Sequence, residues 1–296
     1  MMEKDIRIIK GLCCKFFMIE DTAHIVIKRL GGLTNRNYKV VVNGQEYVFR
    51  LPGQGTEELI NREEEHICTS LANEINVDSE LIYFENMTGI KISKFIYEAE
   101  TMDKESVKKR NNMQAIAEIF KQLHFCNIIV PVEFNVFEKI EKYENLLKKC
   151  GENFLWEDYM EVKKKVINLK EKTSKMNVKS TICHNDPLCE NFVKGKEKMY
   201  LVDWEYAGMN DPMWDLADLF IEAEFTQEEE FLFHKLYFGQ EADSKMKSRI
   251  LINKIFLDFL WSLWGIQRYS CGEDLLEYAN QRFIRAKKNL QLLSGV

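Results

Sequence analysis

One segment in the second half of this 296-residue chain constrains its fold more than any other. It begins at His184 and reads HNDPLCENFVKGKEKMYLVDWEYAGMNDPMWD. Two short runs in it, 192–194 and 199–202, flank a turn at Gly195, and this pattern predicts a two-stranded hairpin. Asn191 stands directly before the first strand and Asp203 directly after the second. Because the outer ends of a hairpin lie side by side, we expect these two side chains to point at one spot.

The residues at these positions are suited to one kind of chemistry. Oxygen atoms of Asn191 and Asp203, completed by water, form a ligand set suited to Mg²⁺. Asp186, upstream in the same loop, is placed to accept a proton from a substrate hydroxyl. A loop Asp as base, with an Asn and a second Asp on the metal, is the residue set of kinase-type phosphoryl transfer. Such triples also arise by chance in acid-rich chains, but the spacing and strand context favour the phosphotransferase hypothesis.

Composition narrows the remaining classes of protein. A chain with 46% hydrophobic and 30% charged residues is long enough to form two globular lobes around a cleft. Its net charge of −6, with no block of basic residues, argues against a nucleic-acid-binding groove. The eight cysteines form no CxxC pair and the five histidines show no ligand spacing, so zinc is not expected.

No targeting or membrane segment is expected. The first residues carry acids and lack the uninterrupted apolar region of a secretory signal. The longest apolar stretch, 255–266, is interrupted by Asp258 and is too short to span a bilayer. These features predict a cytoplasmic enzyme without membrane insertion.

The order of predicted elements indicates an α+β, two-lobed fold. A small antiparallel sheet is predicted from strands at 24–30, 36–51, 80–84 and 90–93, the second folded into a hairpin at Asn43-Gly44. Helices are predicted at 3–18, 56–73, 103–125, 137–149, 155–173, 212–224, 226–238, 244–268 and 273–292. We therefore predict a nucleotide-binding lobe over 1–96 and a helical catalytic and substrate lobe over 97–296, with a hinge at 95–101. This arrangement is kinase-like.

Two motifs in the first lobe suit phosphate binding. Gly31-Gly32 joins two predicted strands, and glycines let the backbone approach phosphates closely. A glycine pair alone is weak evidence, but with the metal motif downstream it predicts a nucleotide loop in which Gly32, Thr34 and Asn35 contact ATP.

Arg50 closes the strand 47–50, where its guanidinium can hold phosphate oxygens bidentately. An acid on the next helix should hold Arg50 in turn. Glu63, Glu64 and Glu65 are all available, although three consecutive glutamates can also be a solvated helix face.

Two tryptophans on the helix 244–268 lie outside its core stripe. Seven apolar residues of this helix fall within an arc of about 140°, whereas Trp261 and Trp264 lie together on another side. Either another helix or a ligand must cover them, and tryptophan rings attract quaternary ammonium groups by cation–π interaction.

These motifs together resemble a known superfamily. HNDPLCEN followed by LVDWEYAGMNDPMWDLADLFIEAEF is similar to the choline/ethanolamine kinases and aminoglycoside phosphotransferases, relatives of the protein kinases. Within them it is most similar to bacterial Lic-type choline kinases. The likeness continues at LGGLTNRNYKV, FRLPGQGTEELINREEE and WSLWGIQRY. It implies a Mg²⁺-dependent kinase that transfers the γ-phosphate of ATP to choline and forms phosphocholine.

The resemblance also implies roles for single residues. It favours Glu65 as the partner of Arg50, and it implies that Asp215 hydrogen-bonds the backbone of the catalytic loop. Glu205 is implied as a metal ligand through water. The remaining matches line a trimethylammonium pocket: Tyr206, Glu222, Trp261, Trp264 and Tyr278.

The chain departs from the eukaryotic pattern at Leu188, where those choline kinases carry Gln, so contacts near the substrate hydroxyl are left open. The nearest alternative is a kinase for ethanolamine, another amino alcohol or an aminoglycoside. An alternative of a different class is an inactive nucleotide-binding module, against which the intact Asp186, Asn191 and Asp203 argue.

Overall fold

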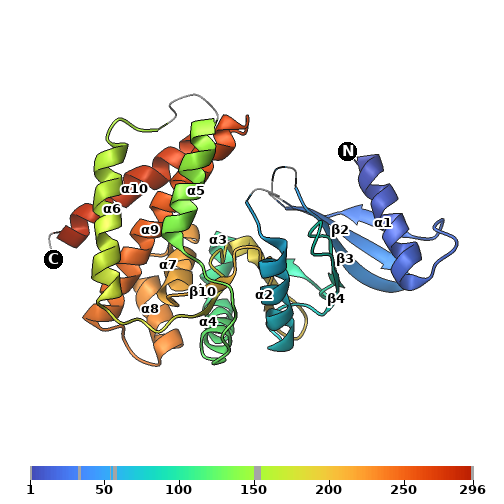
Figure 1. The fold of residues 1–296 in the computed structure, drawn as a ribbon. Helices are drawn as coiled ribbons and strands as arrows, with labels where there is room; N and C mark the ends of the chain where they lie inside the picture. The colour runs from blue at the N-terminus through green and yellow to red at the C-terminus, as the bar shows by residue number, and fades with distance from the viewer. Residues whose placement is uncertain (1, 33–34, 54, 56–58, 150–154, 295–296) are drawn as a thin grey trace. The chain divides into compact units, whose positions relative to one another are not determined.

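The computed structural model describes residues 2–32, 35–53, 55, 59–149 and 155–294 (Figure 1). The chain divides into two compact units. The first comprises Met1–Met102 and Glu190–Ala207, and the second comprises Asp103–Cys189 and Gly208–Val296. The hairpin with Asn191 and Asp203 thus belongs to the first unit. A lobe boundary between residues 96 and 97 stays a prediction.

The first unit is built on a five-stranded antiparallel sheet with the order β1-β2-β3-β5-β4. Its strands are β1 (Val26–Arg29), β2 (Arg36–Val42), β3 (Gln45–Leu51), β4 (Leu81–Phe84) and β5 (Lys91–Lys94). Asn43 and Gly44, between β2 and β3, have φ angles of 52° and 75°. Two consecutive positive φ angles are those of a type I′ turn, so the predicted hairpin is confirmed.

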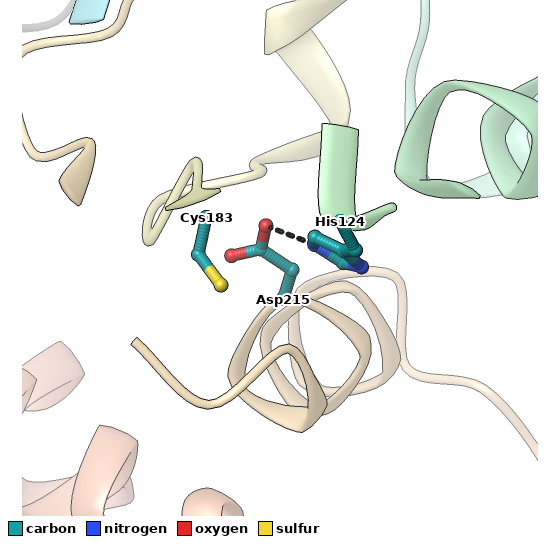
Figure 2. Close-up of side chains that lie close together, drawn as sticks. All are labelled: His124, Cys183 and Asp215. Atoms are coloured by element: carbon teal, nitrogen blue, oxygen red, sulfur yellow. Dashed lines mark hydrogen bonds and ion pairs between the residues drawn. The ribbon is translucent and has the colours of Figure 1, made fainter. Parts of the chain in front are cut away.

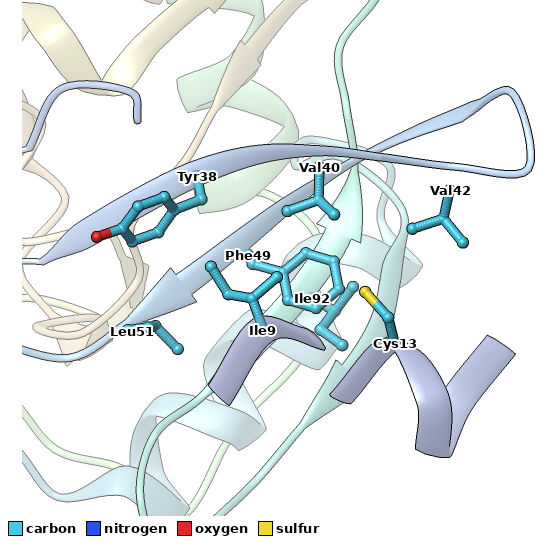
Figure 3. Packing of buried hydrophobic residues seen from close by; sticks show 8 residues of the cluster. All are labelled: Ile9, Cys13, Tyr38, Val40, Val42, Phe49, Leu51 and Ile92. Carbon is cyan, nitrogen blue, oxygen red and sulfur yellow. The ribbon is translucent and has the colours of Figure 1, made fainter. Parts of the chain in front are cut away.

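One face of this sheet is covered by α1 (Met2–Phe17) (Figure 3). Ile9 and Cys13 of α1 are fully buried against the sheet. The sheet contributes alternate residues, among them Phe49 and Leu51 from β3, because successive side chains of a strand point to opposite faces. The residue between them, Arg50, therefore points away from α1.

The helix α2 (Arg62–Glu74) follows β3. The sequence predicted a start at Thr56, and this prediction is wrong: residues 59–61 are not helical, while 56–58 lie outside the described residues. The reason is Asn61, whose side chain accepts hydrogen bonds from the backbone N–H groups of Glu63 and Glu64 and caps the helix there.

The predicted hairpin between Asn191 and Asp203 is present. It consists of β8 (Phe192–Lys194) and β9 (Met199–Leu201), and the short strand β6 (Glu100–Thr101) pairs with β8. A single 3₁₀ turn, η1 (Cys189–Asn191), leads into β8.

The second unit is mainly helical, as predicted. Its helices are α3 (Lys104–Val107), α4 (Arg110–His124), α5 (Val136–Lys149), α6 (Tyr159–Ser174), α7 (Met213–Glu222), α8 (Gln227–Phe238), α9 (Ser244–Ser270) and α10 (Leu276–Ser294). The predicted helix 103–125 is interrupted, because Asn112 donates a side-chain hydrogen bond to the carbonyl of Ser106 and Lys109 leaves the helical conformation.

Three short strands in the described part of the chain were not predicted. One is β6, in the segment predicted as the hinge, and the other two are β7 (Thr181–Cys183) and β10 (Gly208–Asn210), which pair antiparallel. Three residues are too few to show an alternating pattern in sequence. None of the helices in the described part of the chain is long and apolar enough to cross a membrane.

Candidate active site

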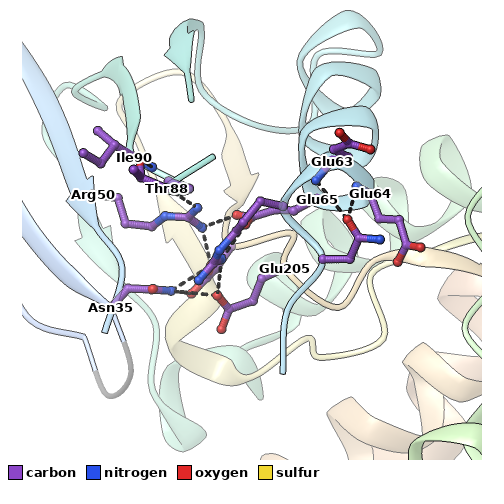
Figure 4. Close-up of polar contacts among 12 residues, drawn as sticks. Asn35, Arg50, Glu63, Glu64, Glu65, Thr88, Ile90 and Glu205 are labelled. Atoms are coloured by element: carbon purple, nitrogen blue, oxygen red, sulfur yellow. Dashed lines mark hydrogen bonds and ion pairs between the residues drawn. The ribbon is translucent and has the colours of Figure 1, made fainter. Parts of the chain in front are cut away.

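Arg50 is the centre of a buried charge cluster in the first unit (Figure 4). Its guanidinium pairs with Glu65 of α2, lies 3.2 Å from Oδ1 of Asp203, and donates to the carbonyl of Gly89 at 3.0 Å. The structure thus selects Glu65 among the three candidate glutamates. Glu63 and Glu64 are exposed, so these two glutamates lie on the solvated face of the helix.

Sequence reasoning missed Arg62. Its guanidinium lies 2.6 Å from Glu65 and 3.4 Å from Glu205, and only 8% of the residue is exposed. The three-residue spacing of Arg62 and Glu65 on one helix face was a signal that could have found it. Gly89 makes room for this arginine, because a Cβ there would lie 2.5 Å from Arg62.

Asn35 connects the glycine loop to this cluster. Its Nδ2 lies 3.4 Å from Asp203 Oδ2 and 3.1 Å from Glu205 Oε2. Gly32 has a φ of 132°, and a Cβ there would lie 2.4 Å from the carbonyl oxygen of Asn35, so only glycine fits. Thr34, also predicted to contact ATP, lies outside the described residues.

The two outer ends of the hairpin meet as expected for its strands. The backbone N–H of Val202 donates to the carbonyl of Asn191 at 2.9 Å, which brings Asn191 beside the residue that precedes Asp203. Asp203 itself has a φ of 73°, a strained conformation for a residue with a side chain. Such strain is typical of functional positions, and here the contacts of Asp203 with Arg50 and Asn35 hold it.

The electrostatics of this cluster favour an added cation. Two guanidiniums, Arg50 and Arg62, face three carboxylates, those of Glu65, Asp203 and Glu205. Burial and the neighbouring charge of Asp203 raise the pKa of Glu205 to about 7. Burial alone would lower the pKa of Arg50, but the adjacent carboxylates outweigh it and raise that pKa.

Oxygen atoms of Glu65, Asp203 and Glu205 lie within 4.8 Å of one another. Glu65 is held closely by both arginines, whereas Asp203 and Glu205 each have one longer arginine contact, of 3.2 Å and 3.4 Å. Asp203 and Glu205 are therefore the carboxylates better placed to hold a hard divalent cation.

In the second unit, Asp215 of α7 fixes the loop that carries Asp186. Its carboxylate accepts hydrogen bonds of 2.8 Å from the backbone N–H groups of both His184 and Asn185. It also lies 3.0 Å from Nε2 of His124 (Figure 2). The expected contact of Asp215 with the loop backbone is therefore confirmed. Asp186, the next residue along, is half-buried.

Cys183, His124 and Asp215 lie close enough to raise the question of a metal. Asp215 already accepts three hydrogen bonds, and His124 uses its second ring nitrogen on Tyr237 at 2.8 Å. Burial and Asp215 raise the pKa of Cys183 well above its ordinary value, whereas a metal would need the thiolate. The cluster therefore supports the loop and does not fit a metal.

Three of the predicted substrate residues form one aromatic cluster in the second unit. The ring centroids of Trp261 and Trp264 lie 6.2 Å apart at 86°, and those of Trp264 and Tyr278 lie 5.8 Å apart at 77°. Trp261 is buried, whereas Trp264 and Tyr278 are half-buried. The second apolar side of α9 is thus partly covered by α10, which leaves part of two rings accessible.

Glu222, predicted to face the substrate cation, is paired with an arginine of the protein itself. It pairs with Arg282 of α10, whose guanidinium lies 4.9 Å from the ring centroid of Tyr278. Sequence reasoning missed Arg282. Tyr206, the remaining predicted pocket residue, is half-buried and belongs to the first unit.

Comparison with known proteins adds an independent line of information. A family model described as choline/ethanolamine kinase matches residues 26–287. Protein LicA of Haemophilus influenzae is 26% identical over 280 residues, which cover 91% of this chain and 81% of that protein.

Two solved structures share the fold. The choline kinase LicA from Streptococcus pneumoniae superposes with a TM-score of 0.82 at 35% identity, covering 96% of this chain and 98% of that one. A structure of LicA in complex with AMP has a TM-score of 0.83 at 34% identity and covers 97% and 98% of the two chains.

The role of Asp215 leads to a direct test. In Asp215→Asn the backbone N–H groups of His184 and Asn185 lose an ionised acceptor, and each such bond contributes on the order of 2 kcal/mol. We expect a lower midpoint of chemical unfolding and faster hydrogen exchange at these two amides. Asp274→Asn, which removes an exposed acid of the same unit, should leave both unchanged. Unchanged exchange in Asp215→Asn would show that Asp215 does not hold the loop.

Proposed function

The chain belongs to the choline/ethanolamine kinase family, an ATP-dependent family of small-molecule kinases, and we propose that it transfers the γ-phosphate of ATP to the hydroxyl of choline. Phosphocholine and ADP would be the products. The observation that carries the choice of choline is the aromatic cluster of Trp261, Trp264 and Tyr278, to which Tyr206 is added from the sequence match. Because ATP is the donor, we also propose a cytoplasmic location.

Asp186 is the proposed base. It accepts or orients the proton of the choline hydroxyl as the oxygen attacks the γ-phosphorus, in the role that a loop Asp has in kinases. Its support is the loop backbone, held by Asp215 through two hydrogen bonds. A loop fixed in this way holds the carboxylate in one place, which lowers the entropic part of the barrier.

Arg50 is the proposed phosphate clamp, and Gly32, Thr34 and Asn35 the proposed nucleotide loop. Glu65 holds Arg50 from α2, so the guanidinium has its position before ATP binds. A Cβ at Gly32 would lie 2.4 Å from the carbonyl oxygen of Asn35, and a glycine at this position also lets a phosphate approach the backbone closely.

Asn191 and Asp203 are the proposed metal ligands, with Glu205 as a further ligand directly or through water. The donor set fits Mg²⁺ because it offers oxygen atoms. Burial and the charge of Asp203 raise the pKa of Glu205 to about 7, and a cation bound beside this carboxylate would stabilise its ionised form. Mg²⁺, when bound, neutralises charge on the transferred phosphoryl group.

The aromatic cluster is the proposed site of the trimethylammonium group. A quaternary ammonium has no N–H donors, so it can leave water for an aromatic wall that offers no acceptor. Ethanolamine keeps three N–H donors that the rings cannot satisfy, which raises its cost of binding. The alternative function is an ethanolamine kinase, and the family description includes both substrates.

Removal of the base is the first test of the mechanism. In Asp186→Asn we expect kcat to fall about 10²–10⁴-fold, the usual loss of a general base, with ATP binding nearly unchanged. Steady-state kinetics with choline, together with ATP titration of the variant, would measure both. Asp274→Asn serves as the control. A variant that keeps more than about a tenth of the wild-type rate would refute this role.

Removal of the metal carboxylate should act differently. Asp203→Ala loses an anionic ligand beside the phosphates, so we expect a higher Mg²⁺ requirement and a higher KM for ATP. Glu197→Ala, an exposed acid in the turn of the same hairpin, is the matched control. If Mg²⁺ titrations of Asp203→Ala and wild type superimpose, Asp203 is not a metal ligand.

A substrate panel of choline, ethanolamine and kanamycin tests the assignment itself. We expect choline to have the highest kcat/KM. Trp264→Ala should raise the KM for choline about two- to thirtyfold, the loss of one cation–π contact, and leave the KM for ATP unchanged. Trp156→Ala is the matched control, because Trp156 stacks on Phe283 of α10 outside the cluster. If the kcat/KM for ethanolamine equals that for choline, the protein can be assigned only as a kinase of the choline/ethanolamine family and not as one selective for choline.

A further inference from the structure

Arg282 occupies the kind of environment that a substrate ammonium would need. Its side chain is 4% exposed, pairs with Glu222 of α7, lies 3.2 Å from Asp258 of α9, and stands over the ring of Tyr278. A cation between a carboxylate and an aromatic ring is the arrangement that binds organic ammonium ions. A substrate cation that entered the cluster of Trp264 and Tyr278 would therefore compete with Arg282 for Glu222 and for the ring of Tyr278.

A second carboxylate nearby lacks a partner. Asp218 stands one helical turn before Glu222 on α7, so both lie on the same helix face. It is fully buried, and among the described residues neither of its carboxylate oxygens has a hydrogen-bond partner. Buried carboxylates are normally hydrogen-bonded, and an orphaned one therefore calls for an explanation.

The charges around Asp218 come from three helices. Asp215 lies on its own helix, Asp258 faces it from α9, and Arg282 and Arg285 face it from α10. Burial is the largest effect and raises the pKa of Asp218 to about 8, which Asp215 and Asp258 reinforce and the two arginines oppose. At neutral pH the carboxyl is therefore mostly protonated and uncharged.

We propose that Arg282 exchanges partners during the reaction cycle: the substrate ammonium takes over Glu222 and Tyr278, and Arg282 moves to Asp218. The inference rests on the proposed function and extends it. Asp218 and Arg282 are positioning residues in this scheme. It explains why Glu222, which should serve a substrate cation, is paired within the protein, and why an acid with no hydrogen-bond partner is buried one turn away.

Charge and protons balance in this exchange. Without substrate, the charges of Glu222 and Asp258 are matched by Arg282 and Arg285, and Asp218 is neutral. The substrate adds one positive charge, and the Asp218 carboxyl compensates by releasing its proton to solvent as it receives Arg282. One proton therefore leaves for each cation bound.

The exchange sets the sign of a pH effect. The group that must ionise is protonated below its pKa, so cation binding is opposed at low pH and becomes tighter as pH rises. For a single group with a pKa of about 8, the affinity for choline should increase about tenfold between about pH 7 and pH 9.

Calorimetry tests the proton count. Choline binding to the wild-type protein at neutral pH, measured in two buffers of different protonation enthalpy, should release about one proton. Asp218→Asn should release none, and its KM for choline should rise about ten- to a hundredfold while its KM for ATP stays unchanged, because one charged hydrogen-bonded pair is lost. Glu224→Gln, an exposed acid two residues past Glu222 that pairs with Lys104, is the matched control. A wild-type protein that binds choline without releasing a proton would overturn the exchange.

A second measurement needs no substrate. In Glu222→Gln the pair with Arg282 is weakened, so Arg282 should move to Asp218 and ionise it. Infrared spectra of the wild-type protein at neutral pH should contain a protonated-carboxyl band that disappears in Asp218→Asn and therefore belongs to Asp218. The same band should be absent from Glu222→Gln. Persistence of that band in Glu222→Gln would overturn the inference. A protein that phosphorylates neither choline nor ethanolamine would refute the proposed function, and the infrared comparison would still decide whether Arg282 exchanges partners.

Discussion

The structure of the first unit depends on one buried charge, the guanidinium of Arg50, which must be paired with carboxylates to be stable away from water. Removing an arginine from water costs several kcal/mol unless its donors are satisfied, and Arg50 is 3% exposed. Strand alternation points it away from α1, and its partners come from α2, from the turn at Gly89 and from the end of the β8–β9 hairpin. One side chain thus sets the relative positions of three segments that are far apart in sequence.

The second unit uses the opposite charge for the same purpose. Asp215 is a buried carboxylate whose partners are backbone N–H groups and a histidine rather than another ion. The contacts that fix the loop are made to the backbone of His184 and Asn185, so they hold the loop without using the carboxylate of Asp186.

The sequence predicted the elements that short-range chemistry determines. The Asn43-Gly44 turn, the hairpin between Asn191 and Asp203, and most of the helices follow from local pattern. The break before α4 and the β7–β10 pair do not, because the first depends on one side-chain bond to Ser106 and the second on contacts between distant residues. The kinase-like α+β fold was nevertheless predicted correctly, as the structural comparison shows.

The candidate site was predictable to a similar extent. Arg50 and Asp203 could be identified from their places at strand ends, and the tryptophan pair from helical periodicity. Arg62 was missed although its three-residue spacing from Glu65 on α2 was visible in the sequence. Arg282 was missed because it acts through a contact to Glu222, a carboxylate on another segment. Sequence separation hides such pairs, and burial does not become visible until the chain is folded.

The left-handed backbone of Asp203 has a consequence for how this protein can change over evolutionary time. A residue with a side chain at φ 73° is tolerated because Arg50 and Asn35 hold the carboxylate. A lineage that lost Arg50 would therefore lose more than the proposed phosphate contact, since the half-buried carboxylate of Asp203 would have less to restrain it. Positions 50 and 203 are thus expected to vary together or not at all, and glycine and asparagine are the replacements at 203 that the backbone accepts most readily.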